Sequence, residues 1–230
     1  MTINEQSEIR SHEEGARKGL LVAVIALFVV IFDQVSKFLV KTRFYLGEDL
    51  PLTDWWHIKF IENNGMAFGM ELTSKYILTF GRIAAVVLLI WFAIKVLRCK
   101  AIRTGFYIAL ALIIAGAAGN IFDCVFYGVI FNNPMPPQTA EFLPPEGYAP
   151  LFHGMVVDML YFPLFSFVWP EWIPFVGGQE FEFFQYIFNV ADSAICIGVA
   201  LIIFFFSKDA SVAFNFIGER KHAGKDPDTK

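Results

Sequence analysis

Cysteine and histidine are scarce in this 230-residue chain, and neither is arranged for metal or disulfide chemistry. The three cysteines, Cys99, Cys124 and Cys196, lie in or beside apolar segments, and their number and spacing make neither a disulfide framework nor a zinc site. The four histidines are scattered, and the chain contains no H-E-x-x-H motif, P-loop or dinucleotide-binding glycine motif. The sequence therefore gives no sign of metal, disulfide or nucleotide chemistry.

Charged residues are also few, at 17% of the chain against about 25% in soluble domains. The net charge is −4, so the sequence offers no basic surface for nucleic acid. Hydrophobic residues make up 56% and aromatic residues 17%, and they are gathered into long runs. We therefore expect a helical integral membrane protein with a single domain over residues 1–230.

Four apolar segments are long enough to cross a bilayer, which takes about 20 residues in a helix. They cover residues 20–40, 76–97, 104–126 and 183–206. The first has the basic flank of a signal peptide, but polar DQVSK follows it and no small-x-small cleavage pattern is present, so we expect it to be retained. The fold class we expect is membrane all-α with a small β element.

The distribution of Lys and Arg predicts the orientation, because cytoplasmic loops are rich in both. These residues precede the first span, crowd the second-to-third connection and follow the fourth span, whereas residues 124–186 contain none. Residues 41–75 contain four, which is a weaker signal. We expect both termini to be cytoplasmic, with residues 1–18 as a terminal segment and residues 208–230 as a polar, mobile tail.

The two long outer segments differ in composition. Residues 55–70, WWHIKFIENNGMAFGM, have strand-type residues followed by a glycine turn. Residues 134–174 carry nine prolines, too many for a regular helix or a central strand. The stretch YFPLFSFVWPEWIPF (161–175), at the end of this segment, is apolar enough to lie on the membrane surface. The sequence therefore predicts a small outer β element and a segment at the lipid boundary.

Two aspartates, Asp123 and Asp192, interrupt otherwise apolar spans. A charge at the bilayer centre costs at least about 2.5–3.5 kcal/mol, so such a residue usually has a function or a partner. Each follows an asparagine by three residues, Asn120 and Asn189, and N-x-x-D occurs nowhere else in the chain. Positions i and i+3 share a helix face, so each pair faces one side. From the predicted span ends, both carboxylates can lie in the outer half of the membrane.

Several functions are compatible with this pair of carboxylates. Two carboxylates held close together share a proton, and one can then activate water while the other protonates a scissile carbonyl, as in aspartic proteases. Intramembrane carboxylates also serve as proton relays in transporters, although no polar path continues here through the inner half. A third alternative is a non-catalytic assembly or lipid-binding protein in which the Asn–Asp pairs hold helices together.

Other polar residues flank the same outer side. Asp33 and Lys37 are spaced i and i+4, which suits an internal ion pair, and Lys37 could also organise the outer site. Asn63 and Gly65 belong to a turn that either exposes backbone groups to an extended peptide or closes a plain hairpin. Asp158 ends a short β-like run, and we assign it a structural or supporting role.

The segments that carry these residues resemble lipoprotein signal peptidase (signal peptidase II), a family of bacterial membrane aspartyl proteases. They occur in the family's order as DQVSK, NNGMAFG, AGNIFDCVFYG, GMVVDM and FNVADSAICIG. The resemblance implies that Asp123 and Asp192 are catalytic. It implies that the residues supporting the site or the substrate are Asp33, Lys37, Asn63, Gly65, Asn120, Asn189 and Ala191, to which we add Asp158.

The resemblance also implies an architecture and a substrate. The architecture is four transmembrane helices with an outer-face β-cradle and a membrane-surface helix. The reaction is removal of the signal peptide from diacylglyceryl-modified prolipoproteins, with cleavage just before the lipidated cysteine. It takes place in the bacterial inner (cytoplasmic) membrane near the periplasmic face, without a metal or organic cofactor. The expected partners are this substrate and membrane lipids, with no nucleic acid, and we expect a monomer.

The chain departs from the family pattern at two places. Cys124 stands where an arginine usually follows the first aspartate, so that cation is missing or supplied elsewhere. Residues 129–153 intervene before GMVVD, where typical members have only a few residues. We expect these changes to affect substrate access or selectivity and not the chemistry.

Overall fold

The computed structural model describes residues 3–64, 75–97 and 99–223. The chain divides into two compact units, each with its own hydrophobic core. The first unit comprises residues 1–31, 80–119 and 191–230, and the second comprises residues 32–79 and 120–190.

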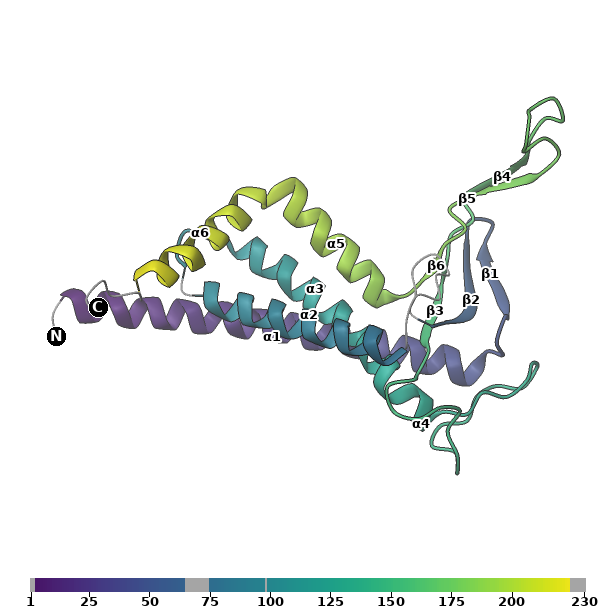
Figure 1. The fold of residues 1–230 in the computed structure, drawn as a ribbon, viewed down its shortest axis with the longest axis horizontal. Coiled ribbons are helices and arrows are strands. Elements are labelled where there is room, and N and C mark those ends of the chain that lie inside the picture. The colour runs from purple at the N-terminus through teal and green to yellow at the C-terminus, as the bar shows by residue number, and fades with distance from the viewer. Residues whose placement is uncertain (1–2, 65–74, 98, 224–230) are drawn as a thin grey trace. The chain divides into compact units, whose positions relative to one another are not determined.

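Figure 1 shows the helices, which follow most of the predicted apolar segments. Among the described residues, three helical stretches are long and apolar enough to span a bilayer. A fourth arises if α5 and α6, which meet at an angle of 89°, count as one broken span. The helices are α1 (Ile3–Arg43), α2 (Lys75–Val96), α3 (Thr104–Phe122), the π-helix η2 (Asp123–Tyr127), α4 (Gly128–Ile130), α5 (Val190–Phe205) and α6 (Ser207–Ala223).

The prediction of the fourth span was wrong at its start. Helix α5 begins at Val190 and not at residue 183, because Ile187–Phe188 form strand β6 and pair with Leu160 and Tyr161. Asp192 therefore lies in the first turn of α5. With 16 residues, α5 alone is shorter than the about 20 residues that a full span requires.

The expectation of a mobile tail after Ser207 was also wrong for the first part of that segment. Residues Ser207–Ala223 form α6, and Ala213 is fully buried in the core of the first unit. Arg103 donates hydrogen bonds to the Asp209 carboxylate at 2.6 to 2.9 Å and to the Phe205 carbonyl at 2.6 Å. These bonds hold the corner between α5 and α6.

Close helix packing in the first unit depends on glycine. A Cβ atom added at Gly116 of α3 would collide with the carbonyl oxygen of Ala191 in α5. A Cβ atom at Gly198 of α5 would lie 2.7 Å from the carbonyl oxygen of Ala109 in α3. The two backbones therefore touch, as is common between membrane helices with small residues at their interface.

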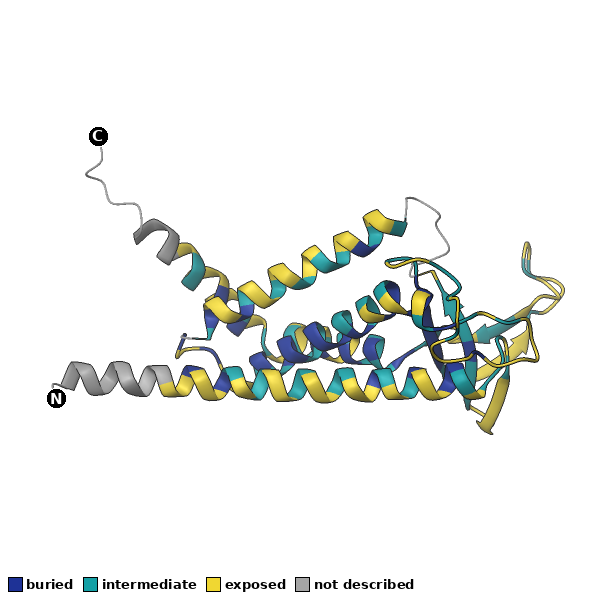
Figure 2. Cartoon of the chain, turned by 90° about the horizontal axis from the view of Figure 1, so that it is seen from below, coloured by how far each residue is buried: buried dark blue, intermediate teal, exposed yellow. Residues whose placement is uncertain are grey.

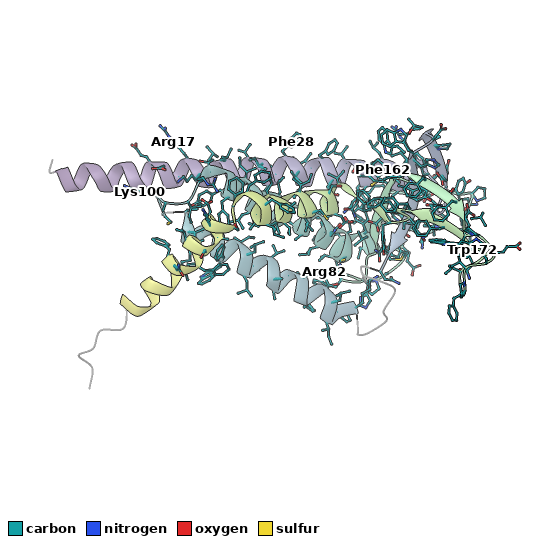
Figure 3. All side chains as sticks on the ribbon, turned by 90° about the horizontal axis from the view of Figure 1, so that it is seen from above. Arg17, Phe28, Arg82, Lys100, Phe162 and Trp172 are labelled. Atoms are coloured by element: carbon teal, nitrogen blue, oxygen red, sulfur yellow. The ribbon has the colours of Figure 1, made fainter. Side chains whose placement is uncertain are left out.

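The outward surfaces of the first unit are apolar. Figure 2 shows exposed residues alternating with partly buried ones along α1 and α2, and the exposed side chains include Leu20, Phe28 and Leu88. Such surfaces suit lipid rather than water. In Figure 3, Arg17 and Lys100 lie near one end of this unit, and Phe28 lies further along α1.

The second unit contains two small antiparallel sheets, so the predicted β element is present. Strands β1 (Asp49–Thr53), β2 (Trp56–Asn63), β3 (Val156–Tyr161) and β6 form one sheet in the order β1-β2-β3-β6. Strands β4 (Phe165–Val168) and β5 (Glu180–Phe183) form the other. Five of the six residues in β3 are buried, namely Val156 to Met159 and Tyr161, so β3 lies at the centre of the unit.

The aromatic stretch 161–175 forms strand β4 and contains no helix, so it does not supply the expected membrane-surface helix. Its alternating phenylalanines pair across the two strands, and the rings of Phe165 and Phe183 stack at 4.9 Å. Beyond the strands, Trp172 and Phe175 are 81% and 99% exposed, and Trp172 projects outward in Figure 3.

Residues 129–153 contribute to the core of the second unit. Phe131 and Ala140 are buried with Val40, Phe60 and other residues of α1, η2 and the sheet. The backbone amide of Ala140 donates to the carbonyl oxygen of Lys41 at 3.3 Å. Part of this insertion is therefore structural, whereas its exposed residues are available for the substrate-related role that the sequence suggested.

Candidate functional site

Asp123 begins the π-helical turn η2 and has a fully buried side chain. The loop before β3 secures this turn, because the amides of Gly154 and Phe152 donate to the carbonyls of Cys124 at 2.9 Å and Val125 at 3.1 Å. A Cβ atom at Gly154 would collide with the carbonyl oxygen of Asp123, so only glycine fits there. A π-helical turn inside a longer helix often occurs at a functional site.

Three donors converge on the Asp123 carboxylate. The Gln34 amide nitrogen lies 2.8 Å from Oδ1, and the Lys37 ammonium lies 2.7 Å from Oδ2. The backbone amide of Val157 in β3 also donates to Oδ2 at 3.4 Å. Helix α1 and strand β3 thus approach Asp123 together and fix its carboxylate.

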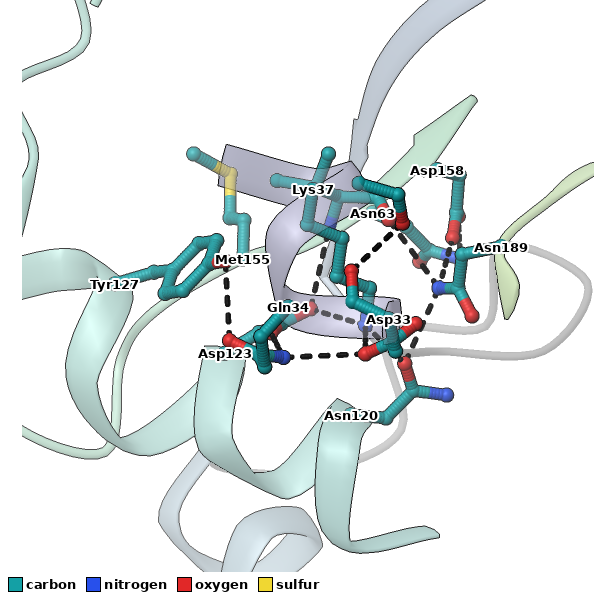
Figure 4. A network of polar contacts seen from close by, with 12 residues as sticks. Asp33, Gln34, Lys37, Asn63, Asn120, Asp123, Tyr127, Met155, Asp158 and Asn189 are labelled. Carbon is teal, nitrogen blue, oxygen red and sulfur yellow. Dashed lines mark hydrogen bonds and ion pairs between the residues drawn. The ribbon is translucent and has the colours of Figure 1, made fainter. Parts of the chain in front are cut away.

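Lys37 is the centre of this buried polar network, which is drawn in Figure 4. Its ammonium carries three N–H groups. They reach Asp33 Oδ2 at 2.9 Å, Asp123 Oδ2 at 2.7 Å and Asn120 Oδ1 at 2.8 Å. The predicted ion pair with Asp33 is confirmed, and the same lysine also binds both polar residues of the first N-x-x-D motif.

A second group of amides extends the network to β2 and β3. Asn189 Nδ2 lies 3.1 Å from Asn120 Oδ1, 3.2 Å from the Val157 carbonyl oxygen and 2.7 Å from Asp158 Oδ1. Asn63 donates to Asp158 Oδ2 at 3.4 Å. The side chain of Asp158 therefore joins the strand β2 to the residue that precedes α5.

The network includes two residues that the sequence did not single out, Gln34 and Tyr127. The Tyr127 hydroxyl donates to Gln34 Oε1 at 3.1 Å, and Gln34 Nε2 also lies 3.1 Å from Asp33 Oδ2. Weak signals for both exist in the sequence. Gln34 follows Asp33 directly, and Tyr127 lies four residues after Asp123, which places it on the same helix face.

The structure thus brings most of the predicted supporting residues together around Asp123. Ala191 and Asp192 belong to the first unit, where Ala191 is fully buried and Asp192 lies in the first turn of α5. Gly65 falls outside the described residues. The predicted residues that share the network with Asp123 are Asp33, Lys37, Asn63, Asn120, Asp158 and Asn189.

A second buried ion pair, also missed from the sequence, lies in the core of the second unit. The Lys41 ammonium is 2.5 Å from Glu62 Oε1 and faces the rings of Phe60, Phe131 and Tyr148 at 5.1 to 5.8 Å. Burial raises the pKa of the Tyr148 phenol, which keeps that ring neutral beside the cation. This pair ties α1 and β2 to the insertion.

No group of three or more His, Cys, Asp or Glu side chains within the described part of the chain is arranged to hold a metal ion. In the network itself, the buried carboxylates are held by an ammonium, amides and a backbone N–H group. Buried carboxylates held in this way can take up or release a proton.

Comparison with known proteins identifies the family of this chain. The family described as "Signal peptidase (SPase) II" matches residues 25–208. The lipoprotein signal peptidase of Porphyromonas gingivalis is 44% identical over 85% of this chain and 86% of its own length. The lipoprotein signal peptidase of Amoebophilus asiaticus is 35% identical over 78% of this chain and 74% of its own.

A solved structure described as a bacterial membrane enzyme has a similar fold. Its TM-score is 0.57 at 28% identity, over 83% of this chain and 90% of that one. The family match covers the whole polar network and the start of α5. Taken with the apolar helices, these similarities show that the chain is a membrane protein belonging to the signal peptidase II family.

Proposed function

We propose that this protein is an intramembrane aspartyl endopeptidase that removes the signal peptide from diacylglyceryl-modified prolipoproteins. Cleavage takes place just before the lipidated cysteine, and Asp123 and Asp192 form the catalytic pair. Membership of the signal peptidase II family supports a peptidase that acts on prolipoproteins. The remaining parts of the proposal rest on the residues of the site.

One observation carries the assignment of the two aspartates. The asparagines that precede them by three residues are hydrogen-bonded to each other, with Asn189 donating to Asn120 at 3.1 Å. Asp123 and Asn120 share Lys37 as a partner, so the first Asn–Asp pair faces one side. Asp192 is separated from Asn189 by only three peptide bonds. These facts support an approach of the two carboxylates.

In the proposed reaction, the two carboxylates share one proton. The ionised member removes a proton from water as the water attacks the scissile carbonyl, and the protonated member donates to the carbonyl oxygen. Collapse of the resulting gem-diol releases the signal peptide as a carboxylic acid and the lipoprotein with a free amino group on its lipidated cysteine. No metal or organic cofactor takes part.

Supporting residues then hold the catalytic pair. Lys37 offsets the charge of Asp33 and Asp123, and Asn120, Asn189 and Asp158 secure the start of α5. We assign Asn63, Gly65 and Ala191 to support of the site or the substrate.

The proposed setting is the bacterial inner membrane. The protein acts there as a monomeric single domain among membrane lipids, with both termini cytoplasmic. In this proposal the chain crosses the membrane four times, and an outer β-cradle holds the substrate at a site near the periplasmic face. The acyl chains of the substrate remain in lipid while its scissile bond reaches the aspartates.

The test is cleavage of a synthetic lipobox peptide by the purified protein in lipid nanodiscs, read by mass spectrometry. We expect one cut, directly before the cysteine, in the peptide that carries diacylglyceryl cysteine. The same peptide without the lipid is the matched control and should be cut far more slowly. Absence of cleavage by the folded protein, or a cut elsewhere, would contradict the proposal. A proton-coupled transporter or an assembly protein would leave both peptides intact.

A further inference from the structure

Four helices contribute side chains to the end of the first unit where α2 passes into α3. Helix α1 reaches this end, because a Cβ atom at Gly15 would lie 3.5 Å from the carbonyl oxygen of Leu97. Helix α6 reaches it too, because the Asp209 carboxylate accepts hydrogen bonds from Arg103, which directly precedes α3. Side chains that are far apart in the sequence therefore gather here.

This end of the first unit carries more positive charge than its own carboxylates offset. Glu14 pairs with Lys18, and Asp209 pairs with Arg103. Four further cations are exposed and have no ion-pair partner among the described side chains, namely Arg17, Lys95, Lys100 and Lys208. Of the described carboxylates at this end, that of Glu13 alone remains to offset them. We call these four cations the basic rim, and they are short of counter-ions.

The basic rim lies where the exposed apolar surface of the helices ends. On α1, the exposed apolar surface begins at Leu20, three residues after the cation of that helix. On α2, the Lys95 ammonium lies 6.0 Å from the ring centroid of Trp91, which is exposed. On α5, the exposed Phe205 precedes Lys208 by three residues. A phospholipid has the same order of parts, a charged phosphate followed by apolar acyl chains.

We propose that the basic rim binds the phosphate groups of anionic phospholipids, whose acyl chains lie against the apolar surfaces of α1, α2 and α5. This inference goes beyond the proposed function and does not depend on it, because the basic rim shares no residue with the polar network. Each Lys or Arg near an anionic membrane surface strengthens binding about fivefold. A zwitterionic headgroup has no net charge to offset the cations, so anionic lipid is preferred. A soluble anion would cover the cations but leave the apolar surface bare.

Native mass spectrometry of the full chain in detergent, with equal amounts of phosphatidylglycerol and phosphatidylcholine, measures this preference. We expect the wild type to retain more phosphatidylglycerol than phosphatidylcholine. Lys100→Gln should lower the ratio of the two lipids by up to about fivefold. The quadruple variant, in which glutamine replaces all four cations of the basic rim, should bind both lipids equally. Higher ionic strength should weaken the preference of the wild type, because salt screens exposed charges.

Lys59→Gln is the matched control for loss of a cation. Lys59 lies on β2 in the second unit, where it is half-buried and 3.6 Å from Asp49. Its replacement should leave the lipid ratio at the wild-type value. Thermal melts in nanodiscs give a second measurement, because a lipid that binds the folded protein stabilises it. Phosphatidylglycerol should raise the midpoint of the wild type and not that of the quadruple variant.

Equal binding of the two lipids by the wild type would overturn the proposal, and so would equal effects of Lys100→Gln and Lys59→Gln. Displacement of bound phosphatidylglycerol by inorganic phosphate would assign the cations to a soluble anion and would also overturn it. If the quadruple variant does not fold, Lys100→Gln decides the matter, because that side chain is exposed. Since neither measurement uses peptide cleavage, failure here would leave the proposed function standing.

Discussion

Replacement of Lys37 by methionine removes the only ammonium between two buried carboxylates in the described network. Lys37, Asp33 and Asp123 are each fully buried, and the ammonium lies 2.9 and 2.7 Å from the two carboxylates. Removing one partner of a buried ion pair costs about 3–5 kcal/mol, because the remaining charge is left without compensation. Here two carboxylates remain, so we expect a loss at the upper end of that range.

Asp33→Asn should be much milder than Lys37→Met. It leaves one carboxylate with one ammonium, and the amide oxygen can still accept from Lys37 and Gln34. Lys18→Met is the control on the same helix, because Lys18 pairs with Glu14 at 3.0 Å and the Glu14 side chain is 53% exposed. The Lys18 side chain is itself buried, but methionine keeps its apolar stem and the carboxylate left behind is exposed to solvent, so we expect a loss of about 0–1 kcal/mol.

Thermal and urea unfolding in detergent would measure these stabilities. We expect Lys37→Met to have a far lower unfolding midpoint than Asp33→Asn, and Lys18→Met to lie close to the wild type. Equal destabilisation by Lys37→Met and Lys18→Met would refute the argument that the buried ammonium compensates two charges.

Three further predictions concern local features and topology. Gly154→Ala should lower both the unfolding midpoint and turnover, because its Cβ atom would meet the backbone of the π-helical turn. Gly81→Ala is the control and should lower neither, since Gly81 has open space around it. Equal behaviour of the two variants would contradict this prediction. Cys124→Ser should keep most of the activity in the peptide assay, because burial in an apolar helix disfavours ionisation of the thiol to a thiolate. A loss as large as that of an aspartate variant would assign the thiol a catalytic role. A reporter inserted after Lys100 should lie in the cytoplasm, and one inserted near Pro145 should lie outside. A cytoplasmic reporter near Pro145 would put the site on the wrong face of the membrane.

The spans and the site were predictable to different degrees. Apolar length alone located α2 and α3 to within a residue at their starts, because lipid requires an internally bonded helix of fixed length. The start of α5 was not predictable in this way. Residues 183–189 are as apolar as a helix, and only the pairing of Ile187–Phe188 with β3, a contact distant in sequence, makes them extended.

The residues of the candidate site likewise divide into those that a local sequence pattern predicts and those that only the fold brings together. Asp123, Asn120, Asp33 and Lys37 were found because polar residues in apolar spans are rare and their helical spacing is regular. The contacts of Gln34 with Tyr127 and of Lys41 with Glu62 join segments far apart in the chain. No local pattern reports which face of α1 meets η2 or β2, so these pairs became visible only in the fold.

The most direct test of the central claim compares the wild type with Asp123→Asn and Asp192→Asn in the lipidated-peptide assay, with matched thermal melts. Each substitution keeps the volume of the side chain and its capacity for hydrogen bonds but removes the group that must gain or lose a proton. We expect both variants to fold and turnover to fall by several powers of ten in each. Near-normal cleavage by either folded variant would contradict the aspartyl mechanism, and loss of folding in both would favour a purely structural role for the two carboxylates.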